Sequence, residues 1–144
     1  MNSNAGSFES VKNIIDAGLD SIRVSIISAN DENYQRYYRA VYKFDDVKRS
    51  VDYALKNNVY VSLNLLYFPG FNDRVVEVES WKKFLNEFPV QMIQIRNLNL
   101  DPEIFSRIMP ADDEFLGTKK FIETLQKNFP RIQIGNFSHF VKNG

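Results

Sequence analysis

The sequence of 144 residues contains no cysteine. Disulfides, thiolate nucleophiles and thiolate-bound zinc or iron–sulfur clusters are therefore excluded within this chain. The single histidine also excludes a His-paired catalytic triad and a multi-histidine metal site. The acidic run Asp112 to Glu114 is interpreted as a helix cap, because acids in a first turn usually stabilise the helix start. We predict no catalytic residue and no metal site in this chain.

Net charge and long apolar runs are also missing. Eighteen Lys and Arg residues balance eighteen Asp and Glu residues, so no overall electrostatic field recruits nucleic acid or an anionic membrane. No apolar run approaches the roughly 18 residues of a membrane span, and the first ten residues lack the signal-peptide pattern. We expect no nucleic-acid partner, no membrane partner and a cytoplasmic location.

Regular alternation of helix and strand patterns is present along the whole chain. Apolar residues make up 44% of it, which is enough for one domain over residues 1–144 with a core of its own. Helical spacing of apolar residues predicts helices over 7–17, 44–58, 74–88 and about 118–128, and strand patterns cover 21–27, 59–68, 90–98 and 131–137. No hairpin signal separates the strands, so we predict an α/β fold with a parallel sheet and right-handed crossovers.

Local signals predict both ends of the first helix, the N-cap of the second and the buried residues of the third. Ser7 suits the N-cap of the first helix and Gly18 its left-handed stop. Asp45 or Asp46 is the expected cap of the second helix. The third helix is expected to bury Val78, Trp81 and Leu85.

Polar side chains alternate with aliphatic ones in all four predicted strands. A parallel sheet covered by helices on both faces reads as near-continuous aliphatic runs. We therefore predict helices on one face only, with the other face lining the polar cavity of a partial barrel. The alternation fits an ordinary solvent-exposed sheet face equally well. The polar positions are Arg23, Ser25, Ser62, Asn64, Gln94, Arg96 and Gln133.

Arg23 and Arg96 sharpen this prediction, because a permanent cation in a dry cavity needs an anion, a carboxylate or water. Both should project to the side opposite the helices. Four strands cannot close a barrel, which usually takes about eight. Nothing before the first helix is long enough to pair with strand 21–27. Either the chain is a fragment of a larger barrel, or another chain covers the edge, as in an edge-strand dimer.

Three phrases in order resemble the second half of the core of radical S-adenosylmethionine (radical SAM) enzymes, in their cofactor-maturation and activating-enzyme branches. The phrases are "RVSIIS" at 23–28, "Y…R…FDDV" at 37–47 and "N…PGFND" at 64–73. The "SNAG" that precedes the first helix is similar to the tail of the family's third strand. The resemblance covers residues 4 to about 98. It implies a partial (β/α) barrel.

The resemblance also implies roles for individual residues. Those expected near S-adenosylmethionine are Ser25, Asn64, Arg96 and Asn97, and those expected to line the lumen toward substrate are Arg23, Ser62, Gln94 and Gln133. Ile27 stands where the family usually has an acidic residue. The CxxxCxxC loop that holds the family's 4Fe–4S cluster is absent, as is the glycine-rich motif of its second strand.

By this resemblance the chain is the C-terminal part of a larger oxidoreductase that acts on a small-molecule or peptide substrate. In the full-length protein a reduced cluster would cleave S-adenosylmethionine to a 5′-deoxyadenosyl radical. Alone, without the N-terminal half of the barrel, the chain is expected to bind no cofactor and to be inactive. The alternative is a complete, non-catalytic α/β domain that binds a small ligand or a protein, with Arg23 and Arg96 as an anion clamp.

Overall fold

The computed structural model describes residues 2–3, 5–38, 43–68, 70–97 and 116–136. The acidic run Asp112 to Glu114 lies outside these ranges. The elements follow in the order β1 (Asn2–Ser3), α1 (Phe8–Asp16), β2 (Ser21–Ile26), α2 (Asp31–Tyr38), α3 (Phe44–Lys56), β3 (Tyr60–Tyr67), α4 (Val75–Glu87), β4 (Met92–Asn97), α6 (Thr118–Asn128) and β5 (Gln133–Asn136).

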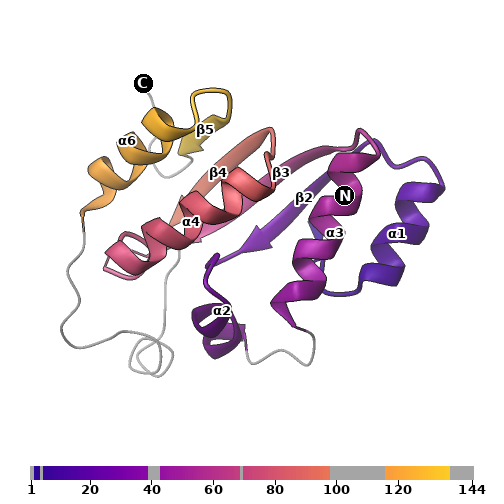
Figure 1. Cartoon of the computed structure of the whole chain (residues 1–144), viewed down its shortest axis with the longest axis horizontal. Coiled ribbons are helices and arrows are strands. Elements are labelled where there is room, and N and C mark those ends of the chain that lie inside the picture. The colour runs from indigo at the N-terminus through magenta and orange to yellow at the C-terminus, as the bar shows by residue number, and fades with distance from the viewer. Residues whose placement is uncertain (1, 4, 39–42, 69, 98–115, 137–144) are drawn as a thin grey trace.

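The strands form one parallel sheet in the order β1-β2-β3-β4-β5, each beside its predecessor in sequence. Right-handed crossovers that always step in the same direction place every connecting helix on the same side of a sheet. Figure 1 shows this arrangement, with α1, α3, α4 and α6 in front of the strands and α2 beyond the end of β2. The prediction of helices on one face is confirmed, and the other face has no cover from the described residues.

The short strand β1 corrects one expectation. Asn2 pairs with Arg23 and Ser3 with Val24, so the segment before α1 does pair with the second strand. The sheet therefore has five strands in its described part instead of the four predicted. The expectation that "SNAG" contains the end of a strand is confirmed at its first described residue, Ser3.

Most predicted helix boundaries are confirmed within one or two residues. Ser7 caps α1, where its hydroxyl accepts from the Ser10 backbone N–H, and Gly18 has the left-handed φ of 111° expected after the helix. The cap of α3 was predicted wrongly: the N-cap is Lys43, and the Asp46 carboxylate accepts from the Lys43 backbone N–H. An acid at the third helical position can reach back in this way.

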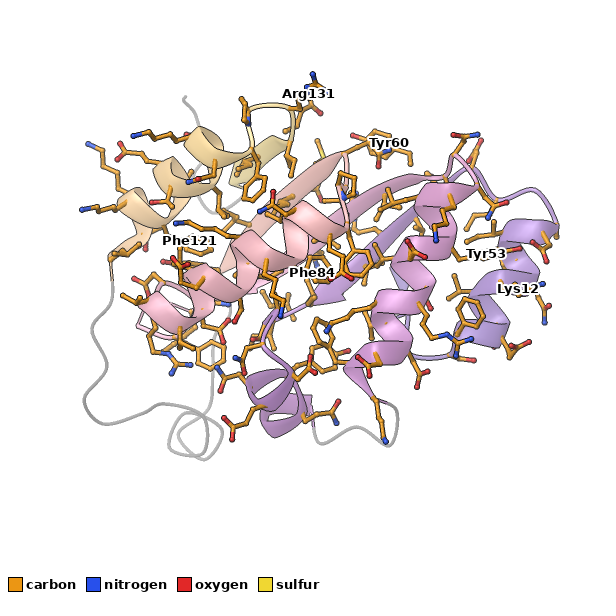
Figure 2. The ribbon with its side chains drawn as sticks, viewed as in Figure 1. Lys12, Tyr53, Tyr60, Phe84, Phe121 and Arg131 are labelled. Carbon is orange, nitrogen blue, oxygen red and sulfur yellow. The ribbon has the colours of Figure 1, made fainter. Side chains whose placement is uncertain are left out.

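One hydrophobic core fills the space between helices and sheet. Ile22, Val24 and Ile26 of β2 join it from the sheet, together with the alternate aliphatic residues of β3 and β4. Trp81 is fully buried on α4 as predicted, and Phe84 and Phe121 pack under α4 and α6 (Figure 2). None of the described helices has both the length and the apolarity needed to cross a bilayer.

Candidate functional site

The face of the sheet opposite the helices, here called the open face, gathers the polar residues that alternate with the core. Strand pairing places Ser62 beside Arg23 and Asn64 beside Ser25. Side chains of paired residues point to the same side of a sheet, and every second residue does so along a strand. The open face therefore includes Arg23, Ser25, Ser62, Asn64, Gln94, Arg96 and Gln133.

The register divides these residues into three levels along the strands. Arg23, Ser62 and Gln133 lie level with Met92, toward the strand beginnings. Ser25, Asn64 and Gln94 form the next level, and Arg96 lies opposite Leu66 nearest the strand ends. Ligands of parallel α/β sheets bind at the carboxyl ends of the strands, so Ser25, Asn64 and Arg96 occupy the expected half.

Arg23 and Arg96 share the open face, as predicted. Four residues of β4 separate Arg96 from the level of Arg23, which is about 13 Å along the strand. The two arginines therefore lie at different levels of the open face. The single anion clamp of the alternative hypothesis stays a prediction.

Burial on the open face is uneven. Arg23 and Arg96 are exposed, whereas Ser62 and Gln94 are only 7% and 8% exposed. The side chains of Arg23, Ser25, Asn64 and Arg96 have no hydrogen-bond or ion-pair partner among the described residues. This combination is neither a dry core nor a plain solvated surface. It is a shallow polar face whose groups are available to a ligand or to further protein.

Asn97 is the last residue of β4 and pairs with Tyr67. Its side chain lies outside the part of the chain that the structure describes. Its predicted contact with the cofactor therefore stays a prediction.

A second polar group lies at the carboxyl ends of the strands, in the loop between β3 and α4. The fully buried Asn72 accepts from the Phe68 backbone N–H at 2.6 Å and donates to the Ile27 carbonyl oxygen at 2.6 Å. Asp73 accepts from the backbone N–H groups of Gly70 at 2.7 Å and Gly117 at 2.9 Å. The "PGFND" phrase thus ties the ends of β2 and β3 to the start of α6.

Glu77 is buried beside this loop and was not singled out from the sequence. Ser28 donates to its carboxylate at 2.8 Å, Asn33 donates at 2.5 Å, and the guanidinium of Arg74 lies 3.9 Å away. Burial raises the pKa of Glu77 to about 7, although the hydrogen bonds from Asn33 and Ser28 and the charge of Arg74 act to lower it. The helical spacing of Glu77 with Trp81 and Phe84 was the available signal of burial.

These two polar groups differ in one respect that decides their roles. In the second group, the side chains form their hydrogen bonds with other residues of the chain and so hold the loops in position. These residues are Asn72, Asp73 and Glu77. On the open face, by contrast, the side chains of Arg23, Ser25, Asn64 and Arg96 have no such partner among the described residues. The open face is accordingly the better candidate for a binding site.

The family model of the radical SAM superfamily matches residues 1–81. This match covers more than half of the chain, and the chain belongs to this superfamily. Its fold is the superfamily's partial (β/α) barrel. No curated protein matches the sequence.

Two solved structures are similar to the chain. One is a radical SAM methyltransferase from Sphaerobacter thermophilus, with a TM-score of 0.62 and 15% identity over 93% of this chain and 38% of that chain. The other is a domain of pyruvate-formate lyase-activating enzyme from Bacteroides vulgatus ATCC 8482, with a TM-score of 0.63 and 8% identity over 93% of this chain and 78% of that chain. At these identities the likeness concerns the fold. The chain spans well under half of the length of the methyltransferase.

The superfamily implies S-adenosylmethionine and a 4Fe–4S cluster in its full-length members. The cluster does not fit this chain, because its three thiolate ligands require cysteines that the sequence lacks. The described residues also contain no group of three or more His, Asp or Glu side chains placed to hold a metal ion. S-adenosylmethionine places a different demand on the chain, because hydroxyl, amide and guanidinium groups are of the chemical type that binds ribose hydroxyls and carboxylates. Ser25, Asn64 and Arg96 carry such groups on the open face.

Proposed function

We propose that residues 1–144 form the C-terminal part of the barrel of a radical SAM enzyme and that this part positions cofactor and substrate. The observation that carries the proposal is the open face, where four polar side chains have no hydrogen-bond or ion-pair partner among the described residues: Arg23, Ser25, Asn64 and Arg96. The sheet supports it as well, because β1 and β5 each pair on one side only in the described part. An N-terminal half of the barrel would cover that face and pair with the free edge of the sheet.

Within this proposal Ser25, Asn64, Arg96 and Asn97 hold S-adenosylmethionine at the strand ends. Bound cofactor supplies the carbon-centred radical that abstracts hydrogen from the substrate. The chain's own residues bind and orient: Arg96 offers a fixed cation to a carboxylate, and Ser25 and Asn64 offer hydrogen bonds to hydroxyl groups.

Four residues are proposed to face a small-molecule or peptide substrate. Three of them lie toward the strand beginnings, Arg23, Ser62 and Gln133, and the fourth, Gln94, lies two residues further along β4 than their level. The cysteines for the cluster must come from the N-terminal half. The chain alone is therefore expected to bind no cluster and to leave S-adenosylmethionine intact.

Anaerobic reconstitution of the chain with iron and sulfide tests this expectation. Ultraviolet–visible absorption and an iron assay should show no stoichiometric cluster, and chromatography should show no 5′-deoxyadenosine from added cofactor and reductant. A stoichiometric cluster together with cofactor cleavage contradicts the proposal. The reading frame upstream of residue 1 gives an independent check, since a CxxxCxxC within about 100 codons matches three βα units of 30 or more residues.

Arg96→Met in the protein that contains both halves tests the role of the strand ends. It should lower cofactor cleavage at least tenfold, mainly through weaker cofactor binding, because a charged hydrogen bond is lost. Arg131→Met is the matched control, since Arg131 is exposed at the opposite end of the strands, before β5 begins (Figure 2). Equal cleavage by Arg96→Met and the parent protein contradicts this role.

A complete, non-catalytic α/β ligand-binding domain is the second candidate. The unpartnered guanidinium of Arg23 favours it, because it provides an anion contact that needs no cluster. Two results would support this second candidate. One is a reading frame that starts at residue 1 with no cysteine motif upstream, and the other is a chain that stays monomeric in light scattering.

A further inference from the structure

We propose that the half of the open face toward the strand beginnings binds a small carboxylic acid that carries an N–H or O–H donor beside its carboxylate, such as an amino acid or a hydroxy acid. The binding is a property of this chain alone. The proposed function is needed only to name this molecule as the substrate.

A cavity of about 240 Å³ lies at this place, lined by Arg23 of β2, Tyr60 and Ser62 of β3, and Met92 and Gln94 of β4. Drug-sized ligands occupy pockets of about 300–1,000 Å³, so this cavity suits a smaller molecule. Tyr60 lies at the beginning of β3 (Figure 2) and provides an aromatic wall. The Met92 thioether provides a second weakly polar wall.

Gln94 supplies the strongest sign that a ligand belongs here. Its side chain is only 8% exposed, and its Oε1 has no hydrogen-bond partner in the described part of the chain. Its Nε2 donates to the sulfur of Met92 at 3.4 Å. A buried amide oxygen without a hydrogen-bond donor costs free energy. A ligand in the cavity that offers an N–H or O–H group to this oxygen would remove that cost.

Arg23 supplies the charge. Its guanidinium is exposed, lines the same cavity and has no ion-pair partner among the described residues. The open-face positions of β2, β3, β4 and β5 include two arginines and no acidic residue within the described ranges. A carboxylate is the anion that a guanidinium binds with two parallel hydrogen bonds.

The register brings these two groups to opposite sides of one small ligand. Arg23 is level with Ser62 and Met92, and Gln94 is two residues further along β4. The Cα atoms of Arg23 and Gln94 are therefore roughly 12 Å apart by ordinary sheet spacings. Two side chains that extend from the same face leave room between them for a carboxylate and an adjacent donor group.

Nuclear magnetic resonance of the ¹⁵N-labelled chain tests the proposal, read at the Arg23 Nε–H and the Gln94 side-chain amide. The probes are L-alanine and L-lactate, with acetate lacking the donor and ethylamine lacking the carboxylate. L-Alanine and L-lactate should give saturable shifts at both groups. Acetate should bind about tenfold more weakly, and ethylamine should give no saturable shift.

Paired variants show whether the named residues carry the binding. Arg23→Met and Gln94→Leu should each weaken L-alanine and L-lactate at least tenfold, whereas Arg131→Met and Gln126→Leu, at exposed positions, should not. Gln94→Leu removes a buried amide whose oxygen has no hydrogen-bond partner in the described part of the chain, so the variant should fold, and its spectrum verifies this. Absence of saturable shifts with both acids, or unchanged affinity in both cavity variants, overturns the proposal.

The outcome is independent of the proposed function. If neither acid binds, but the protein that contains both halves of the barrel cleaves S-adenosylmethionine, only this inference fails. If the acids bind and no cysteine-bearing half exists, this inference stands and the radical SAM function of the chain fails.

Discussion

Glu77 makes the clearest prediction at the scale of single residues. Its pKa is raised from 4.5 to about 7 by burial, so the folded chain binds more protons than the unfolded chain between these pH values. The contribution of Glu77 to the free energy of unfolding is therefore greatest below pH 4.5 and falls by on the order of 3 kcal/mol as pH rises through 7. Urea unfolding midpoints measured between pH 4 and 8 follow this fall.

Glu77→Gln removes the titrating group and should flatten the pH dependence over this window. Glu79→Gln is the matched control, because Glu79 is exposed on the same helix, where it pairs with Lys82. It should keep the slope of the parent chain. If Glu77→Gln and the parent chain lose stability equally as pH rises, the carboxyl of Glu77 does not titrate in this range.

Single residues also show where sequence reasoning succeeded and failed. Arg23 was placed correctly on the face away from the helices, because alternation along a strand is a local property. Glu77 was missed because its burial depends on Ser28, which lies 49 positions away in the sequence. A charged residue on a predicted helix is usually assigned to the surface until its tertiary neighbours are known.

At the scale of elements, the two glycines Gly18 and Gly135 give a matched prediction. Gly18 ends α1 with φ at 111°, where a side chain strains the backbone even though an added Cβ would meet nothing within 4 Å. Gly135 lies in β5 with equal space and without a positive φ. Gly18→Ala should lower the free energy of unfolding by about 1–2 kcal/mol, as measured by urea unfolding.

Gly135→Ala should leave this free energy unchanged or raise it by about 0.5 kcal/mol, because glycine weakens a strand interior. Equal destabilisation by both substitutions would mean that the backbone angle of Gly18 does not set the cost. The elements themselves were well predicted from sequence: the helix at Thr118–Asn128 agrees with the periodicity, and the parallel pairing agrees with the alternation of helices and strands. The N-cap of α3 was predicted wrongly, because the Asp46 carboxylate binds the Lys43 backbone N–H from the third helical position instead of occupying the cap position itself.

At the scale of the whole molecule, the unpaired edges of the described sheet predict self-association. Strand edges that end in free backbone groups pair readily with other chains. Light scattering should show a mass that rises with concentration. Gln133→Lys adds a charge on the exposed edge strand β5 and should weaken this association, whereas Gln126→Lys on the exposed side of α6 should not.

A monomer at every concentration contradicts the edge-paired dimer and weakens the proposal that half of a barrel is missing. It favours the complete ligand-binding domain. The same measurement on the protein with both halves should give a monomer, because the added strands would pair with the free edge of the sheet.

The sequence alone determined the alternation of helices and strands, the one-sided placement of the helices and the lack of cluster ligands. The first two follow from periodicity, which is read over a few neighbouring residues. The third follows from composition, which needs no knowledge of the fold. Tertiary structure decided which polar residues are available. It placed Arg23 and Arg96 about 13 Å apart along the strands, buried Gln94 without a partner for its oxygen, and tied Glu77 to Ser28. Strand register and burial depend on contacts between distant segments, so no local pattern could fix them.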